Sequence, residues 1–473
     1  MKTPHPLVSL IPFAFLISVL ACIITAFGAD SLSGASQVAL LASGGLAAGI
    51  ALIVYRVPWS RIEEAIVGNF KTVVLSLLIL LFIGAVAGTW MISGIVPTLM
   101  YYGLKILSPK IFLFAVCVIC AIVSVVTGSS WTTIATIGVA LIGVGMALGF
   151  STGWTAGAII SGAYFGDKIS PLSDTTVLAS ASAEVPIFEH IRYMMITTVP
   201  SIAITCIVFL IMSLCHGSCD SVEASEFSDA LCGAFNITPW LLLVPLATGY
   251  MIYKRLPALL TLFVSSLLAA IAAIIAQPDL VLGIGDGSMF KGMMITVYGD
   301  TAVQTSSEIL NGLVQTHGVV GMLNTVFLII CAATFGGVLI GSGMIDSITS
   351  VLAKGVKGRT SLVGVTAFTG LFNNLFCGDQ YLSIVLTCNL NKALFKKMGY
   401  EPRLLSRSAE DSATVGSVLV PWNSCGMTQS TVLRVPTLEY LPFCFFNLLS
   451  PLMTVFVAAI GYKINGPVKK DRE

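Results

Sequence analysis

The sequence predicts an all-α, polytopic membrane protein of about 12–14 transmembrane helices. Of its 473 residues, 56% are hydrophobic and only 10% are charged, whereas a soluble domain carries about 25% charged residues. Apolar stretches long enough to cross a bilayer recur along the whole chain. The 24 Lys and Arg residues balance 23 Asp and Glu residues, so the chain has no basic surface for nucleic acid. This composition excludes a soluble enzyme.

About fourteen apolar stretches are candidate membrane crossings. Lys2 and the apolar run 7–28 resemble a signal sequence, but the run is too long for one, so we expect a first transmembrane helix. The segment 278–320 is Gly-rich and mildly polar, and we expect it to be external or re-entrant. The candidate crossings fall near residues 7–28, 35–55, 72–95, 111–127, 134–149, 154–182, 193–214, 239–253, 256–277, 321–346, 360–377, 380–398, 410–432 and 441–463.

The distribution of Lys and Arg sets the predicted orientation, because cytoplasmic loops are enriched in these residues. With the N-terminus inside, alternating crossings place few basic residues outside, and the acidic loop 215–238, which has no Lys or Arg, falls outside. Both termini are then cytoplasmic. The inside segments contain Arg56, Arg61, Lys71, Lys254, Arg255, Lys354, Lys357, Arg359, Lys392, Lys396, Lys397, Arg403, Arg407, Lys463, Lys469, Lys470 and Arg472, and the outside segments contain Lys105, Lys110, Lys291 and Arg434.

Similar Gly- and Pro-containing segments recur at an offset of 249 to 250 residues. Val185-Pro186 with Glu189 is repeated as Val435-Pro436 with Glu439. The other repeated positions are Ser93-Gly94 with Ser342-Gly343, Gly128 with Gly378, and Pro171 with Pro421. We infer that two halves of the chain descend from one duplicated unit.

The duplication predicts two inverted repeats of about five helices each. The two copies are residues 72–214 and 321–463. Each copy has an odd number of crossings, and an even number of linker helices lies between them, so the second copy enters the membrane from the opposite side. The predicted organisation is therefore N-terminal transmembrane helices 1–71, first repeat 72–214, connecting loop and linker helices 215–320, second repeat 321–463, and cytoplasmic tail 464–473. Inverted repeats with interrupted helices are typical of secondary transporters.

Polar segments interrupt the apolar stretches in both copies, at 128–133, 166–176, 373–381, 410–414 and 421–426. Unpaired backbone groups cannot face lipid, so such breaks must face protein or water. Their carboxylate, hydroxyl and amide oxygens are ligands for a small hard cation. The candidate sodium ligands are Asp174, Asp379, Asp411, Asn423, Ser173 and Thr175. The candidates for proton and ion coupling are Asp167, Glu410, Gln380, Asn374, Thr133 and Ser129.

Several of these residues also have ordinary structural interpretations. Asp167 could form an ion pair with the adjacent Lys168 at a helix end, and Glu410 could be an acid at a helix start. Ser129 and Thr133 could bond only to neighbouring backbone. The sequence leaves these alternatives open.

A buried carboxyl group can exchange cations without covalent chemistry. Loss of hydration disfavours its charged form, so a proton and a sodium ion compete for the same acid. If the site changes sides only when neutralised, the result is exchange of one cation for the other. We expect no enzyme and no cofactor, and HExxH, GxSxG and nucleotide-loop motifs do not occur in the sequence.

The motifs GDKISPLSDTT (166–176) and AEDSATVGSVLVPWNSCG (409–426) resemble the NhaC-type sodium/proton antiporter family, as do GDQYLSIVL (378–386) and VPTLEYLPFCFFNLLSP (435–451). The likeness extends over roughly residues 70–465. It implies exchange of cytoplasmic sodium for external protons in a bacterial inner membrane, with only transported Na+ and H+ bound. The expected partners are membrane lipids, monovalent cations and protons, and a homodimer is one possible assembly.

The resemblance assigns Asp167, Ser173, Asp174 and Thr175 to one site element, and it assigns Asp379, Gln380, Glu410, Asp411 and Asn423 to another. Some similar members exchange malate and lactate or carry amino acids. The alternative function is therefore a sodium- or proton-coupled exchanger of organic anions or amino acids. An organic anion would need a cationic side chain or helix N-termini at the membrane midplane, and Lys168 is the strongest candidate for the cation.

Overall fold

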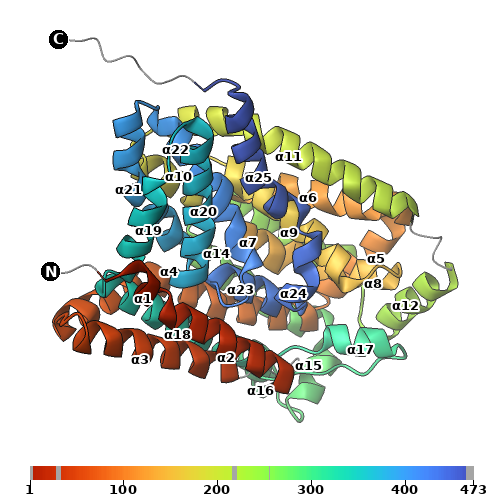
Figure 1. The fold of residues 1–473 in the computed structure, drawn as a ribbon. Helices are drawn as coiled ribbons and strands as arrows, with labels where there is room; N and C mark the ends of the chain where they lie inside the picture. The colour runs from red at the N-terminus through yellow and green to blue at the C-terminus, as the bar shows by residue number, and fades with distance from the viewer. Residues whose placement is uncertain (1–3, 28–33, 216–220, 255, 465–473) are drawn as a thin grey trace.

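The computed structural model describes residues 4–27, 34–215, 221–254 and 256–464 (Figure 1). Over these ranges the chain is helical, and its one extended pairing is an isolated bridge between Thr301 and Thr316. The predicted all-α class is confirmed. The C-terminal residues 465–473, Lys2, Arg255 and residues 216–220 of the acidic loop, all used in the sequence predictions, lie outside the described residues.

The helices before the central linker are α1 (Pro6–Ser9), α2 (Ile11–Phe27), α3 (Ala35–Ile53), α4 (Trp59–Ile92), α5 (Ile95–Ile106), α6 (Phe112–Thr127), α7 (Ser130–Thr133), α8 (Val139–Ala147), α9 (Thr152–Ile169), α10 (Asp174–Ser182) and α11 (Ile187–Cys215). The linker contains α12 (Ser221–Ala234), α13 (Leu243–Tyr253), α14 (Ala258–Ala276), α15 (Pro278–Ile284), α16 (Met289–Tyr298) and α17 (Glu308–Val314). The remainder forms α18 (Val320–Gly341), α19 (Met344–Lys354), α20 (Arg359–Cys377), α21 (Gln380–Met398), α22 (Pro402–Ala409), α23 (Ser424–Leu433), α24 (Thr437–Tyr440) and α25 (Phe445–Ile460).

Nine helices within the described ranges are long and apolar enough to cross a membrane, or up to twelve if three bent pairs each count as one span. The upper count meets the lower end of the expected range. The stretches 154–182 and 410–432 fail as single crossings because polar breaks divide them. In contrast, α4 is a continuous helix of 34 residues that begins well before the predicted start at residue 72. The charged residues in its first turns kept the apolar run from starting earlier, but they are part of the helix.

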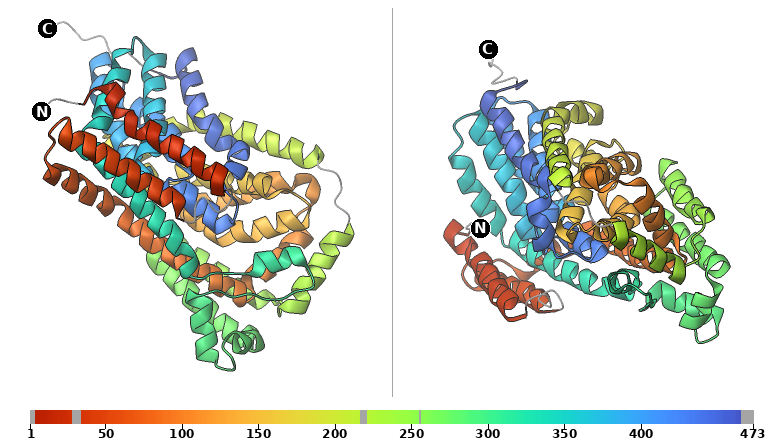
Figure 2. Two further views of the ribbon diagram at one scale, coloured as in Figure 1. Left: turned by 60° about the horizontal axis from the view of Figure 1, so that its bottom comes forward. Right: turned by 90° about the vertical axis from the view of Figure 1, so that its right-hand side faces the viewer.

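On one side of the molecule, α3 packs along α18 and α2 packs against α3 (Figure 2). Leu16 and Leu40 are fully buried there with Phe335 of α18. The two described ends of the chain both lie near the connection between α19 and α20. Ser347 of α19 bonds to the carbonyl of Pro4, and Arg359 of α20 donates to the carbonyl of Ala459 at 3.1 Å. This arrangement agrees with two termini on one side of the membrane, but which side they face stays a prediction.

Repeated residues adopt repeated backbone conformations. Gly128 and Gly378 end α6 and α20 with φ of 66° and 63°, a left-handed conformation that costs glycine little. The turns before Val185 and Val435 also match, because Glu184 and Arg434 have φ of 58° and 56°. These similarities support the predicted duplication, while the inverted orientation of the two copies stays a prediction.

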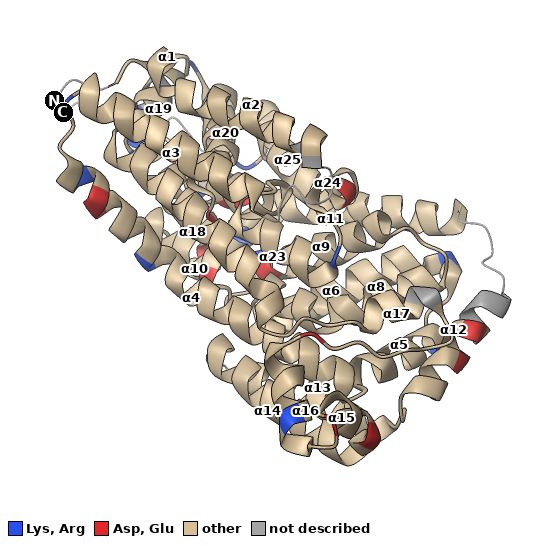
Figure 3. Ribbon diagram, turned by 90° about the horizontal axis from the view of Figure 1, so that it is seen from below, with Lys and Arg blue, Asp and Glu red and all other residues tan. Residues whose placement is uncertain are grey.

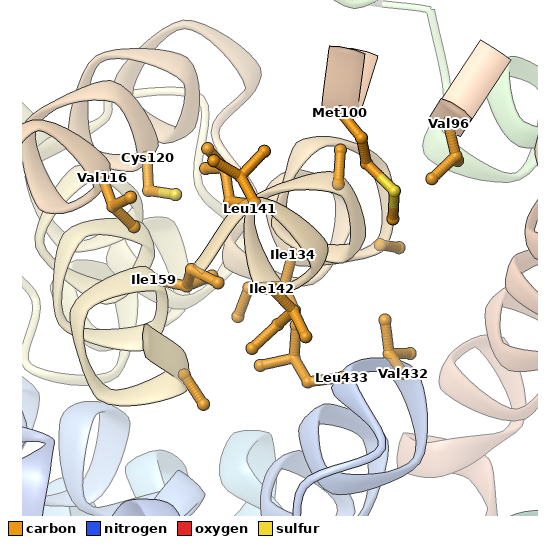
Figure 4. Packing of buried hydrophobic residues seen from close by; sticks show 14 of the residues in the cluster. Val96, Met100, Val116, Cys120, Ile134, Leu141, Ile142, Ile159, Val432 and Leu433 are labelled. Atoms are coloured by element: carbon orange, nitrogen blue, oxygen red, sulfur yellow. The ribbon is translucent and has the colours of Figure 1, made fainter. Parts of the chain in front are cut away.

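The two halves share one apolar core. Figure 4 shows Ile142 of α8 near Leu433 of α23, with Ile159 of α9 on the other side of the same cluster. Packing of this kind fixes the end of α23 against the first half. The halves therefore meet at buried side chains close to the polar breaks.

The α6–α9 contact places the end of α9 and depends on two glycines spaced four residues apart. A Cβ atom at Gly162 would lie 2.1 Å from the carbonyl oxygen of Cys117, and one at Gly166 would lie 2.4 Å from that of Ala121. Small residues at this spacing let membrane helices approach closely. The contact carries Asp167 and Lys168 at the end of α9 into the protein interior.

We expect Gly162→Ala to destabilise the protein by about 1–3 kcal/mol, because the added methyl group must force α6 and α9 apart. The matched control is Gly45→Ala on α3, where a Cβ atom meets nothing within 4 Å. Thermal denaturation in detergent should show a lower midpoint for Gly162→Ala only. Equal midpoints for both variants would contradict this account of the α6–α9 contact.

The predicted external or re-entrant segment 278–320 is largely helical. Helices α15 and α16 form a pair bent by 78°, and they lie with α12 and α17 at the lower right of Figure 1. Arg434 donates to the carbonyl of Gly312 at 2.9 Å and so fastens the end of α17 to the second half. The side of the membrane that this segment faces stays a prediction.

Candidate functional site

The polar breaks of both halves meet around a cavity of about 440 Å³. The first half contributes Asp167, Ser173 and Asp174, and the second half contributes Gln380 and Tyr381. Apolar residues of α4, α13 and α14 complete the wall. Figure 3 shows acidic residues near α10 and α23, in the middle of a ribbon whose other charges lie mainly toward the ends. The sequence prediction that polar breaks face an interior space therefore agrees with this geometry.

Asp167 is the buried carboxylate of the cavity. It lies in the last turn of α9, and its Oδ2 accepts a 2.7 Å hydrogen bond from Ser130 Oγ. Asp174 begins α10 and is exposed, and it is close enough to interact electrostatically with Asp167. One acid therefore lies at the open part of the cavity and the other at its buried end.

Hydroxyl groups surround these acids. Ser173 precedes α10 and its Oγ lies 2.9 Å from Thr175 Oγ1. Ser129 Oγ accepts a hydrogen bond from the backbone N–H of Thr132 at 3.2 Å, and Thr133 Oγ1 donates to the carbonyl of Ser129 at 2.9 Å. Both residues also have hydroxyl partners, since Thr132 Oγ1 donates to Ser129 Oγ at 3.1 Å and Thr133 Oγ1 lies 3.2 Å from Thr127 Oγ1, so they do not bond to neighbouring backbone alone. Ser173 and Thr175 present hydroxyl oxygens next to the carboxylates.

The second half forms a buried polar network that connects its breaks. Asp379 Oδ1 accepts the N–H of Leu382 at 2.9 Å, as an N-cap of α21, and Asp379 Oδ2 accepts from Ser424 Oγ at 3.1 Å. Asn423 donates to the carbonyl of Asn374 at 3.2 Å. Asn374 donates in turn to the carbonyl of Ala413 at 2.7 Å, and Gln380 donates to that of Thr414 at 2.8 Å. The network joins α20, α21, α23 and the π-helix Glu410–Thr414.

Asp411 lies behind this network in a fully buried ion pair with Lys168. Lys168 Nζ also donates to Ser450 Oγ at 2.9 Å, and Thr197 Oγ1 donates to Asp411 Oδ1 at 3.1 Å. The adjacent Asp167 and Lys168 therefore have different partners, and the ion pair between these two neighbours that the sequence allowed is not formed. Four helical elements meet at the Lys168–Asp411 pair.

Glu410 is fully buried beside Asp411, and neither of its carboxyl oxygens has a hydrogen-bond partner among the described residues. It lies in the π-helix and not at the start of a helix, so the interpretation as an acid at a helix start does not describe its position. A π-helical turn inside an α-helix is common at functional sites.

Eleven of the twelve predicted residues therefore form three groups and not one ligand shell, while Thr133 bonds to the carbonyl of Ser129 and does not line the cavity. Asp167, Ser173, Asp174 and Thr175 face the cavity with Ser129 and Gln380, while Asp379, Asn374 and Asn423 form the buried network, and Glu410 and Asp411 lie beside Lys168. In the described part of the chain, no group of three or more His, Cys, Asp or Glu side chains could hold a metal ion.

Sequence reasoning missed four residues of the site. Ser130 bonds to Asp167, and Tyr381 lines the cavity within the electrostatic reach of Asp167, Asp174 and Asp379. Both lie inside polar breaks that the sequence identified. Thr197 and Ser450 contact the buried ion pair, but each is a hydroxyl residue within an apolar helix and gave no signal.

A bundle of membrane-crossing helices, interrupted where two halves enclose a buried polar site, has the architecture of a secondary transporter. The chain belongs to the Na+/H+ antiporter family, whose model matches residues 3–183 and 162–462. It is 37% identical to the Na(+)/H(+) antiporter NhaC of Alkalihalophilus pseudofirmus over 406 residues, which cover 86% of each chain.

Two further relatives have names that include other substrates. The Malate-2H(+)/Na(+)-lactate antiporter of Bacillus subtilis is 34% identical over 88% of each chain. The Arginine/ornithine antiporter ArcD of Halobacterium salinarum is 31% identical over 96% of this chain and 92% of its own. The predicted family resemblance is therefore confirmed, and the chain is a multi-pass integral membrane protein.

Proposed function

We propose that this protein exchanges sodium ions for protons across the bacterial cell membrane, and that both cations compete for Asp167. The observation that carries the proposal is the chemistry of the cavity: Asp167 and Asp174 line it with hydroxyl groups, and no Lys, Arg or His among the described residues does. Such a lining attracts cations. Family membership supports the same activity.

In the proposed mechanism, Asp174 at the open part of the cavity attracts a cation, and Asp167 at the buried end binds it. Ser173 and Thr175 can supply hydroxyl oxygens to a sodium ion, and Gln380 brings an amide from the second half. Oxygen donors of this kind suit a hard monovalent cation. The site is then shared by both halves, as alternating access requires.

Competition follows from the burial of Asp167. A carboxylate without hydration is costly in a membrane protein, so Asp167 favours either a bound proton or a bound sodium ion over the bare charge. Movement of the two halves around a neutralised Asp167 would carry one cation in each direction. The buried network of Asp379, Asn374 and Asn423 would transmit that movement between the broken helices of the second half.

An organic substrate is the second candidate, because two relatives are named for malate and lactate or for arginine and ornithine. The cavity is also larger than a bare ion requires. However, no cationic side chain for an organic anion lines it among the described residues, since Lys168 is fully buried and bonded to Asp411. The lining therefore disfavours malate and lactate, whereas the cationic amino acids stay alternatives to sodium that the experiment below separates.

The decisive experiment measures proton movement with a pH-sensitive dye in everted membrane vesicles. Sodium, potassium, malate, lactate, arginine and ornithine are added one at a time, and vesicles without the protein are the control. We expect a response to sodium salts with any anion and none to the organic substrates alone. A response that requires an organic compound would replace sodium/proton exchange with the second candidate.

A further inference from the structure

A second cavity, of about 580 Å³, lies away from the ion site at the start of α11. We call it the basic groove. Its lining residues are Phe188, Glu189, Arg192, Tyr193 and Ile196 of α11, Arg403 of α22, and Lys463, which follows α25. The groove therefore joins three helices that are far apart in the sequence.

The basic groove has excess positive charge. Arg403 is compensated, because its Nη1 lies 3.5 Å from Glu189 Oε1 and its Nε bonds to Glu401. Arg192 and Lys463 are exposed, and neither forms an ion pair with a carboxylate of the described chain. Two cationic side chains thus remain available to an anionic ligand.

A buried guanidinium group adds to this charge. The ring of Tyr193 lies between Arg403 and Arg407, whose guanidinium carbons are 4.8 and 4.7 Å from the ring centroid. Arg407 is fully buried, and none of its guanidinium nitrogens has a hydrogen-bond partner among the described residues. Its charge is therefore poorly screened, and it raises the electrostatic potential under the groove.

An apolar stripe connects the groove to the lipid-facing surface. Phe188 at the groove is 71% exposed, and Val199 and Ile204 further along α11 are 46% and 40% exposed. The spacing of three to four residues places Phe188 and Val199 with Arg192 and Ile196 on one face of the helix. A ligand with a phosphate group and an apolar chain would match both parts, whereas a soluble anion would match only the groove.

We propose that the basic groove binds the phosphate headgroup of an anionic phospholipid, with an acyl chain along the exposed face of α11. Arg192 and Lys463 contact the phosphate, and Phe188 packs against the upper part of the chain. Arg403 lies on α22, which continues into the π-helix that carries Glu410 and Asp411. Because Arg403 lines the same groove, a lipid bound there lies against the helix that leads to the ion site.

Native mass spectrometry of the purified full chain with added phosphatidylglycerol tests this proposal directly. The variant is Arg192→Gln/Lys463→Gln, and the matched control is Lys357→Gln/Lys397→Gln, which removes two exposed charges that do not line the groove. Each basic side chain near a membrane surface contributes about fivefold to the affinity for an anionic lipid. We expect about 25-fold weaker lipid retention in the groove variant and unchanged retention in the control.

Two further arms separate the source of the phosphate and the consequence for transport. Inorganic phosphate at millimolar concentration should not displace the lipid; equal competition by it would replace the lipid with a soluble anion. In phosphatidylcholine liposomes, added phosphatidylglycerol should accelerate exchange by the native protein and the control, but not by the groove variant. Equal lipid retention by the groove variant and the control would overturn the proposal, whatever the transport rates.

Discussion

Asp167→Asn should abolish sodium-dependent proton movement while the protein still inserts and folds. The amide keeps the shape of the side chain and can still accept the hydrogen bond from Ser130. However, it has no negative charge, so it does not take up a proton and does not attract a sodium ion as a carboxylate does. Loss of the central carboxylate should lower the apparent sodium affinity by at least about 100-fold, more than the loss of a residue that only orients a ligand. Sodium uptake into proteoliposomes and the vesicle pH assay would both show the loss.

Two further variants are compared with Asp167→Asn in the same assays. Ser130→Ala keeps the carboxylate and removes only its hydrogen bond, so we expect a weaker effect, on the order of tenfold in sodium affinity. Asp286→Asn removes an acid that is 80% exposed and paired with Lys291, and it should transport normally. Full sodium-driven exchange in Asp167→Asn would show that the buried acid of the cavity is not where the cations compete.

Asp174→Asn should have a different effect from Asp167→Asn, although both acids come from the same motif. Asp174 is exposed, so its attraction for cations is screened by salt. We expect a moderate rise in the sodium concentration needed for half-maximal exchange at low ionic strength. High concentrations of an untransported salt such as choline chloride should remove the difference between the variant and the native protein, because they screen the attraction of Asp174 in the native protein. An effect that does not depend on ionic strength would instead make Asp174 a direct ligand.

The positions of the breaks could be predicted from the sequence because the residues that cause them act locally. Gly128 and Gly378 take a left-handed backbone conformation at the ends of their helices, and the polar residues after them cap the next helix through Ser129 and Asp379. The sequence shows such residues directly. The positions of the breaks and the repetition of the turns therefore followed from patterns that need no knowledge of packing, whereas the capping role of Asp379 was not predicted.

The partners of the buried charges could not be predicted in the same way. Lys168 follows Asp167 in the chain but pairs with Asp411, which is 243 residues away. Which acid becomes exposed is also a matter of packing, because α9 buries Asp167 while Asp174 starts the next helix at the cavity. Contacts between distant helices decide these outcomes, and no local pattern in the sequence records them.

Lys168→Met should be the most destabilising single change at the site. It leaves Asp411 buried with the hydroxyl of Thr197 but without its ammonium partner, and removal of one member of a buried pair costs about 3–5 kcal/mol. Methionine keeps the length and most of the volume of the side chain, so the effect reports charge more than packing. Thermal denaturation in detergent, followed by gel filtration, measures it.

The exposed pair of Lys291 and Asp286 is the matched control. Its nitrogen and oxygen lie 2.5 Å apart, but the side chains are 53% and 80% exposed. Lys291→Met should therefore change stability by less than about 1 kcal/mol. A similar small change in Lys168→Met would mean that Asp411 does not need the ammonium group and is neutral in this state.

The double variant Lys168→Met/Asp411→Asn separates the structural role of the pair from a role in transport. The amide still accepts from Thr197, and no unpaired charge remains, so most of the stability lost in Lys168→Met should return. If Asp411 takes part in cation binding during the cycle, as predicted from its motif, the recovered protein will fold but will not exchange sodium for protons. A recovered protein that exchanges normally would make the Lys168–Asp411 pair purely structural and leave Asp167 as the acid where the cations compete.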